Sequence, residues 1–410
     1  MPGPGFELIG KEEEKEVLDV LRSKWLFRYG DDSNPRFKKK VRTFEEEVCK
    51  AFGVKHALAG STGTSALLAA LAATRVGPGS EVIVPGYTFV ASIASVILSR
   101  AVPILAEVDE SLTLDPEDVE RKITPRTKAI MAVHMIGNPC NMDALKAIAE
   151  KHKLLLIEDV AQAFGGSYKG RRLGTMGTVG ATSFNIFKTI NAGDGGLLYT
   201  DDDELYVRAF GYHDQGHAPG RSGAEIGNRS VIGQDLRMNE LTGAVLLAQF
   251  RKLDGILERL RALKARFKSR LQGAPEIDFR RINDPGECAT ILTILLPDAG
   301  TAASVARELG TVTVSKSGWH VYSNMEHLLN KRTPTEDGCP FNCPLYKGKV
   351  EYYQGMLPKT DALLDRAINL TVGVVCDAQG ASMGVNLNST DREVDHAARQ
   401  VLEAVQKHAG

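Results

Sequence analysis

A lysine, a serine and an acid are spaced in this chain so that they could perform cofactor chemistry. Lys188 lies five residues after Ser183 and shortly before the glycine-rich residues 193–196, and the apolar run 154–157 leads into Asp159. A lysine amine can form an imine with the aldehyde of pyridoxal phosphate. A carboxylate can keep the pyridine nitrogen of that cofactor protonated, so that the ring accepts electrons. The spacing therefore predicts pyridoxal phosphate as cofactor, with Lys188 and Asp159 as the catalytic residues.

Each of these residues also has a simpler interpretation. Asp159 could cap the helix that follows it, Ser183 could be an ordinary strand hydroxyl, and Lys188 could be a solvated loop lysine. Their order along the chain is what favours a site: a turn of small residues comes first, then an acid at the end of a strand, then the serine and the lysine. Together these signals favour an enzyme that carries a cofactor.

Residues 60–67 form the turn of small residues, Gly-Ser-Thr-Gly-Thr-Ser-Ala-Leu, ahead of a helical run. Small residues leave backbone N–H groups free at a helix N-terminus, which suits a phosphate group, although a capped helix start would look the same. The sequence contains neither G-x-G-x-x-G nor G-x-x-x-x-G-K-[ST], which argues against nicotinamide and nucleoside triphosphate enzymes. Gln162, one helical turn after Asp159, could reach the same site.

Composition is that of a globular protein. The chain has 410 residues, of which 43% are hydrophobic, and this length predicts two domains. Its net charge of -1 gives no electrostatic reason to expect binding to nucleic acid or to an anionic membrane. The N-terminus lacks the basic and apolar regions of a signal peptide. Six scattered cysteines suggest reduced thiols in a cytoplasm. Cys339 and Cys343 are interpreted as two loop thiols, and no metal site is expected.

The pattern of the first 255 residues predicts an α/β fold. An amphipathic helix is expected over residues 9–24 and a second helix over 37–52. Short β-branched runs then alternate with helical stretches, which predicts a mainly parallel sheet with helices on both faces. The expected strands cover residues 81–85, 102–106, 127–133, 154–157, 180–184 and 196–200.

The C-terminal part is expected to form a smaller domain. A long helical pattern starts near Met238 and continues to Leu271, as a connecting helix would. Residues 330–360 are interpreted as a long loop, and a last helix is expected over about 391–407. We therefore divide the chain into residues 1–30, a helix and loop that pack with the small domain, 31–255, the large cofactor-binding domain, and 256–410, the small domain.

Ordered sequence segments resemble the DegT/DnrJ/EryC1/StrS family of pyridoxal phosphate-dependent aminotransferases, from about residue 10 to 325 and more loosely to the end. The resemblance implies fold type I, with a smaller C-terminal α+β domain and a homodimer that shares its active sites. The matching segments are residues 62–67, 85–92, 123–129, 133–137, 157–163, 183–188 with 193–196, and 233–241.

The resemblance also implies individual site residues. Lys188 matches the imine lysine, Asp159 the partner of the pyridine nitrogen, and Gln162 the residue near the phenolic oxygen of the cofactor. Phe89 falls where an aromatic ring stacks on the cofactor, which needs an apolar face. The implied phosphate contacts are Thr64, Ser65 and Ser183.

The chain departs from the family at two places. Many relatives have Asn where this chain has Asp235, and that Asn reaches the phosphate in the partner subunit. A carboxylate there would repel phosphate unless protonated or paired, so Arg237 could take over the contact or form an ion pair with Asp235. His320 and Tyr322 resemble a His-Tyr step near the substrate, but the segment after them, to about residue 380, differs from common members. Substrate recognition is expected there.

These observations predict an aminotransferase with a ping-pong cycle. Glutamate or glutamine would give the amino group, and a keto-sugar or keto-cyclitol of antibiotic, other secondary-metabolite or sugar biosynthesis would accept it. One alternative is a sugar dehydratase-like reaction on the same fold, although such relatives have His at the position of Lys188. The other is a non-catalytic, cofactor-binding regulator.

Overall fold

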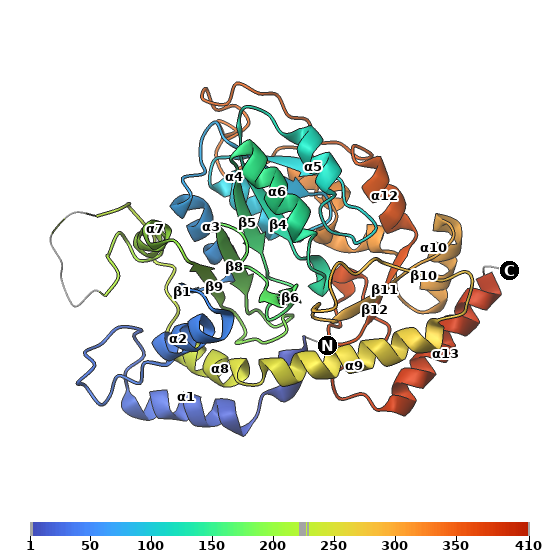
Figure 1. The fold of residues 1–410 in the computed structure, drawn as a ribbon, viewed down its shortest axis with the longest axis horizontal. Helices are drawn as coiled ribbons and strands as arrows, with labels where there is room; N and C mark the ends of the chain where they lie inside the picture. The colour runs from blue at the N-terminus through green and yellow to red at the C-terminus, as the bar shows by residue number, and fades with distance from the viewer. Residues whose placement is uncertain (1–2, 221–226, 228, 409–410) are drawn as a thin grey trace.

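The computed structural model describes residues 3–220, 227 and 229–408 (Figure 1). Its centre is a seven-stranded sheet in the order β1-β9-β8-β5-β4-β2-β3. Neighbouring strands from β8 to β3 are parallel, and β9 is antiparallel to both β8 and β1. The mainly parallel sheet predicted from the sequence is therefore confirmed. The strands are β1 (His56–Gly60), β2 (Glu81–Pro85), β3 (Val102–Ala106), β4 (Thr127–Val133), β5 (Leu155–Asp159), β8 (Val179–Ser183) and β9 (Gly196–Thr200).

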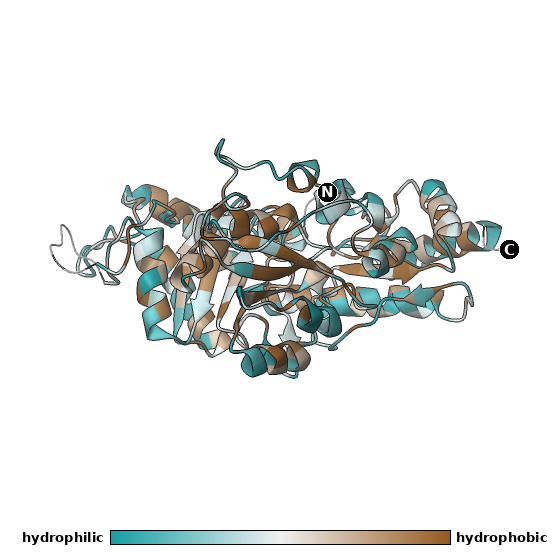
Figure 2. Ribbon diagram, turned by 90° about the horizontal axis from the view of Figure 1, so that it is seen from above, coloured by the Kyte–Doolittle hydropathy of each residue, from teal (hydrophilic) through white to brown (hydrophobic). Residues whose placement is uncertain are grey.

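Helices cover both faces of this sheet because its strands are apolar on both sides. In β4, Ile130 packs into one buried cluster while its neighbours Ala129 and Met131 pack into the other. Figure 2 shows the hydrophobic strands lying between helices with hydrophilic outer faces. Residues on the first face come from α2 (Lys40–Phe52), α6 (Met142–His152) and α8 (Glu240–Phe250), and those on the second from α3 (Gly63–Ala73), α4 (Val90–Leu98) and α7 (Asp203–His213).

The N-terminal segment contacts both the large-sheet part and the C-terminal part of the molecule. Helix α1 (Lys11–Ser23) packs against α8, where Glu13 accepts a hydrogen bond from Gln249 at 2.9 Å. The short η1 (Pro4–Leu8) before it receives a hydrogen bond from Asn388 to Glu7 at 3.2 Å. The sequence places residues 1–30 with the small domain, whereas α1 itself packs on the large one. The domain boundaries at residues 30 and 255 stay a prediction.

The helical pattern that starts near Met238 is divided into two helices rather than one. Helix α8 ends at Phe250, and α9 (Leu253–Leu271) begins after two residues. The Lys252 N–H bonds to the Gln249 carbonyl, a tighter turn than the α-helical one, and the Lys252 amine bonds to the Leu8 carbonyl at 2.7 Å. Contacts to the N-terminal segment therefore accompany a break that the apolar spacing does not reveal.

The C-terminal part is an α+β unit around a three-stranded antiparallel sheet of β10 (Asp278–Phe279), β11 (Ile291–Leu295) and β12 (Ala367–Thr371). The sheet is accompanied by α10 (Ala299–Glu308), α12 (Pro358–Asp365) and α13 (Asp391–His408), the last packed along α9. The loop predicted over residues 330–360 forms neither helix nor strand from 330 to 357, and its last three residues begin α12. The hydroxyl groups of Tyr346 and Tyr352 attach this loop to Glu81 and to the Pro103 carbonyl.

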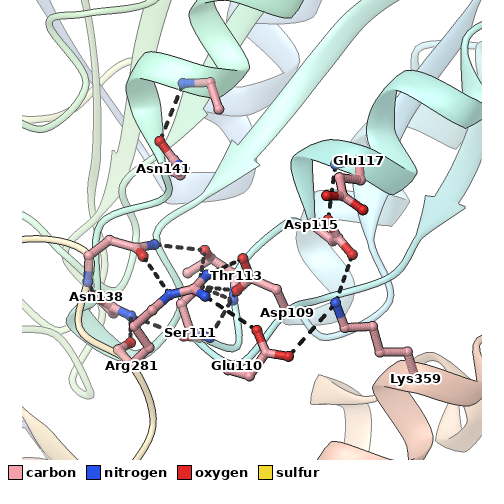
Figure 3. Close-up of polar contacts among 12 residues, drawn as sticks. Asp109, Glu110, Ser111, Thr113, Asp115, Glu117, Asn138, Asn141, Arg281 and Lys359 are labelled. Atoms are coloured by element: carbon pink, nitrogen blue, oxygen red, sulfur yellow. Dashed lines mark hydrogen bonds and ion pairs between the residues drawn. The ribbon is translucent and has the colours of Figure 1, made fainter.

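Polar contacts fasten the C-terminal part to the loop after β3 (Figure 3). Asp109 in this loop accepts hydrogen bonds from the backbone and hydroxyl of Ser111, and it forms an ion pair with Arg281. Lys359 in α12 pairs with Asp115 at 2.9 Å. The two parts of the chain are therefore held together close to the ends of the parallel strands, where the site lies.

Candidate active site

A cavity of about 180 Å³ lies at the carboxyl ends of the parallel strands, the edge where open α/β sheets bind ligands. Six residues singled out in the sequence meet there although they come from different segments: Thr64, Phe89, Asp159, Gln162, Ser183 and Lys188. Other residues of the matching segments also line the cavity, although none of them was assigned an individual role from the sequence. These include Thr62, Gly63, Leu67, Thr88, Ala91, Ser92, Val133, Ala161, Asn185 and Asp194.

Asp159 is the last residue of β5, and its side chain is held rigidly in a buried position. One carboxylate oxygen accepts a hydrogen bond from the Ser92 hydroxyl at 2.7 Å, and the other accepts from the Ala161 N–H at 3.0 Å. The Thr88 hydroxyl lies 2.7 Å from that of Ser92. Two hydroxyl-bearing residues, four positions apart at the start of α4, therefore orient the acid. A sequence signal for these two residues exists: both carry hydroxyl groups, they are four positions apart, and they follow directly after β2.

Lys188 lies in the loop between β8 and β9, where its N–H bonds to the Asn185 carbonyl at 3.0 Å. Burial lowers the pKa of its ammonium group, and the carboxylate of Asp159 opposes that change. Within the described part of the chain, its Nζ makes no hydrogen bond or ion pair that would occupy it. The amine is therefore available for chemistry and is easier to deprotonate than an ordinary lysine.

The N-terminus of α3 faces the cavity through Gly63 and Thr64. The Ser65 N–H and hydroxyl both bond to Thr62, at 3.0 and 2.6 Å, so Ser65 closes the helix cap and does not line the cavity. Helix and strand touch here, because a Cβ on Gly63 would lie 2.4 Å from the Cβ of Ser183. Only glycine permits this approach, which brings the positive end of α3 beside the Ser183 hydroxyl.

Gln162 is fixed by an unusual backbone segment. Its side-chain oxygen accepts a hydrogen bond from the Ile136 N–H at 2.9 Å. Ile136 has a φ of 46°, which is strained for a β-branched residue and commonly marks a functional site. The amide nitrogen of Gln162 is the end left for the cavity.

Phe89 forms the rim of the cavity. Of the two predicted substrate residues, His320 lies next to Phe89, whereas the side chain of Tyr322 points elsewhere. The Phe89 ring is 38% exposed and lies 5.1 Å from the ring of His320. His320 is buried behind it and accepts a backbone hydrogen bond from Thr88. Tyr322 is fully buried and donates its hydroxyl hydrogen to Asp361 at 2.8 Å, so it does not line this cavity.

Arg237 lies outside the cavity within its own chain. It forms ion pairs with the buried Asp214 and with Asp235, the latter at 2.5 Å. The neighbouring Leu236 carbonyl accepts a hydrogen bond from the Ser61 N–H at 2.8 Å, which places this segment beside the turn ahead of α3. Of the two possibilities seen in the sequence, the ion pair between Arg237 and Asp235 is present.

Known proteins resemble this chain over most of its length. The spore coat polysaccharide biosynthesis protein SpsC of Bacillus subtilis is 34% identical over 328 residues, 78% of this chain and 82% of that protein. A GDP-perosamine synthase of Escherichia coli O157:H7 is 36% identical over 271 residues, covering 66% and 71%. The crystal structure of 3-amino-5-hydroxybenzoic acid synthase matches with a TM-score of 0.79, 26% identity and 99% coverage of both chains.

The DegT/DnrJ/EryC1/StrS aminotransferase family matches residues 7–379. The predicted fold type I architecture, the pyridoxal phosphate cofactor and the aminotransferase class are confirmed, and the dehydratase and regulator alternatives are not favoured. The residues present suit that cofactor: a free amine and a fixed acid share one cavity, with a helix N-terminus and a hydroxyl beside them. The chain belongs to the DegT/DnrJ/EryC1/StrS family of pyridoxal phosphate-dependent aminotransferases.

Proposed function

We propose that this aminotransferase moves the amino group of glutamate or glutamine to the keto group of a sugar, with a keto-cyclitol as the second candidate acceptor. The observation that carries the proposal is that the Lys188 amine and the Asp159 carboxylate line one cavity. The names of the relatives support a sugar, because GDP-perosamine is an amino sugar linked to a nucleotide. A nucleotide-linked keto-sugar, made for a polysaccharide or an antibiotic, is the acceptor that we favour.

The catalytic tasks divide between two residues. When bound, pyridoxal phosphate would supply an aldehyde carbon that takes up the amino group and a ring that accepts electrons. The Lys188 Nζ would hold this aldehyde and later carry the proton that leaves the carbon of the donor. The Asp159 carboxylate would keep a proton on the ring nitrogen, and the hydrogen bonds from Ser92 and Ala161 keep it in one orientation.

Four further residues would bind the cofactor. The backbone N–H groups at the start of α3, near Thr64, and the Ser183 hydroxyl would hold the phosphate. The Phe89 ring would cover one face of the pyridine, and the Gln162 amide nitrogen would reach the phenolic oxygen. His320, which packs on Phe89, is the candidate contact for substrate at the rim.

The assembly and compartment are part of the proposal. We propose a homodimer with shared active sites, in which Arg237 reaches the cofactor phosphate of the partner subunit. Its ion pairs with Asp214 and Asp235 support the alternative, a purely structural role.

We propose the cytoplasm as the compartment of the protein, which the six free cysteines support. In the part of the chain that the structure describes, every helix is too short or too polar to cross a bilayer.

Loss of the yellow colour tests the donor, and its return tests the acceptor. Glutamate or glutamine added to the protein with bound cofactor should bleach it, and a keto-sugar added afterwards should restore the absorption and yield an amino sugar. A cofactor that is indifferent to every amino donor would contradict transfer and favour the regulator. A sugar that loses water without gaining nitrogen would favour the dehydratase.

A further inference from the structure

A second cavity, of about 230 Å³, lies between α9 and the sheet strands β10 and β11, in the C-terminal part of the molecule. It shares no lining residue with the cofactor cavity. Much of its wall is apolar and includes Phe279, Ile282, Pro285, Ala289 and Leu292. Drug-sized ligands occupy about 300–1,000 Å³, so this volume suits a molecule with a single small ring.

The charged residues of this cavity are strongly unbalanced. Among the residues that the structure describes, four cations line it, Arg261, Lys264, Lys268 and Arg280, against a single acid, Glu287. Lys264, Arg280 and Glu287 are all more than nine-tenths buried. The Lys264 amine lies 2.6 Å from both oxygens of Glu287, so one carboxylate is already committed to one cation. Buried charges normally have partners of opposite sign, and here cations are in excess.

Arg280 is the second buried cation beside Glu287, with a terminal nitrogen 3.6 Å from the carboxylate, so Lys264 and Arg280 share this one acid. The two terminal nitrogens of Arg280 donate to the carbonyls of Met135 and Ile136, at 3.2 and 2.8 Å. Its Nε is buried and has no hydrogen-bond partner among residues 3–220, 227 and 229–408. Burial, opposed by Glu287 and assisted by Arg280, lowers the pKa of Lys264 to about 8. Burial is the main cause of this lowering, and the neighbouring Arg280 adds to it because both cations are close to the same carboxylate.

We propose that this cavity binds a small monocarboxylate with an apolar body, at a site separate from catalysis. The carboxylate adds a second negative charge to a cavity in which four cations share Glu287. The apolar body packs on Leu292 and beside the Phe279 ring, and the Lys268 amine, 4.9 Å from the centre of that ring, is near enough to meet the carboxylate. The inference goes beyond the proposed function, because it concerns neither the amino donor nor the acceptor. It is tested by binding rather than by turnover, so its failure is distinguishable from a failure of the aminotransferase assignment.

The test titrates the enzyme with bound cofactor by calorimetry, with benzoate as the probe. Benzoate should bind once per chain, and both benzyl alcohol, which lacks the charge, and inorganic phosphate, which lacks the ring, should bind at least about tenfold more weakly. Lys268 at the partly exposed edge of the cavity is the residue to change, because its replacement leaves no buried charge unpaired. Lys268→Met should weaken benzoate about tenfold, and Lys268→Arg should retain the affinity.

Arg270→Met is the matched control. Arg270 lies on the same helix but pairs with Asp395 of α13 and does not line the cavity. Its replacement should leave benzoate binding unchanged. Equal affinities of the wild type and Lys268→Met would place benzoate elsewhere, including the cofactor cavity, and would overturn the proposal. So would the absence of benzoate binding up to about 10 mM.

Discussion

Replacing Glu158 by Gln should destabilise the protein although the two side chains have the same shape. Glu158 precedes Asp159 in β5 and is fully buried. One of its oxygens accepts from the N–H groups of Met176 and Gly177, at 2.7 and 2.5 Å. The other accepts from the Gly174 N–H at 2.7 Å and lies 3.1 Å from the Nε2 of His134.

The magnitude follows from this geometry. An amide has one accepting oxygen, so in Glu158→Gln two of the four donors lose their acceptor whichever way the amide turns. The His134 ring cannot adapt, because its Nδ1 already accepts from the Cys140 N–H at 3.0 Å. Each unsatisfied buried donor costs about 1–3 kcal/mol, which gives about 4 kcal/mol in total. For 410 residues the unfolding entropy is about 0.9 kcal/mol per degree, so the melting temperature should fall by about 5 °C.

Calorimetry of the two proteins without cofactor measures this effect free of any change in cofactor binding. Glu258→Gln, at an exposed position on α9, makes the same chemical change and should leave the melting temperature within about 1 °C. Equal melting temperatures of Glu158→Gln and Glu258→Gln would refute the argument. Such a result would mean that the buried carboxylate contributes nothing beyond its shape.

The same carboxylate gives a pH dependence with a definite sign. Burial alone would raise the pKa of Glu158, but hydrogen bonds from His134, Gly177 and Gly174 bring it below its usual value. A lowered pKa means that the stabilisation is present above about pH 4.5 and is lost as the pH falls through the pKa of the folded state. Glu158→Gln should therefore lose less stability on acidification than the wild type.

Three further predictions concern the site. Asp159→Asn should lower turnover at least about 10²-fold with cofactor still bound, since an amide cannot keep the ring nitrogen protonated. Normal turnover at full occupancy would reduce Asp159 to a structural acceptor of the hydrogen bonds from Ser92 and Ala161, because a turn and not a helix follows it. Ser92→Ala should lower turnover about tenfold, whereas Ser95→Ala, which removes a hydroxyl bonded to the Ser92 carbonyl, should not. Equal rates of the two variants would contradict the orienting role of Ser92. Chains with Arg237→Ala and chains with Lys188→Ala are each expected to be inactive alone. Random mixing makes half of the dimers heterodimers, each with one intact site of two, so about a quarter of the activity should return. No recovery in verified heterodimers would exclude a contact across the interface.

The sequence was sufficient for most of the scaffold, because β-branched runs and helical periodicity depend on local burial. The strands over residues 81–85, 102–106, 127–133 and 196–200 have the predicted bounds. The break between α8 and α9 was not predictable, because apolar spacing continues across it and the contacts around it come from the distant Leu8 and Glu13.

The site was predictable where the residue type itself implies chemistry, as for Lys188 and Asp159, both of which line the cavity. It was not predictable where the direction of a side chain decides. Ser65 turns into the helix cap, and Tyr322 turns toward Asp361. A sequence pattern places such residues near a site but does not show which way they point.

The central claim is that Lys188 is the residue that holds pyridoxal phosphate, and one measurement tests it most directly. The protein with bound cofactor is reduced with borohydride and digested, and the peptide that carries the cofactor is identified by mass spectrometry. We expect a single labelled peptide, with the cofactor attached to Lys188, and no label in Lys188→Ala. Attachment to any other lysine, or undiminished labelling of Lys188→Ala, would contradict this account.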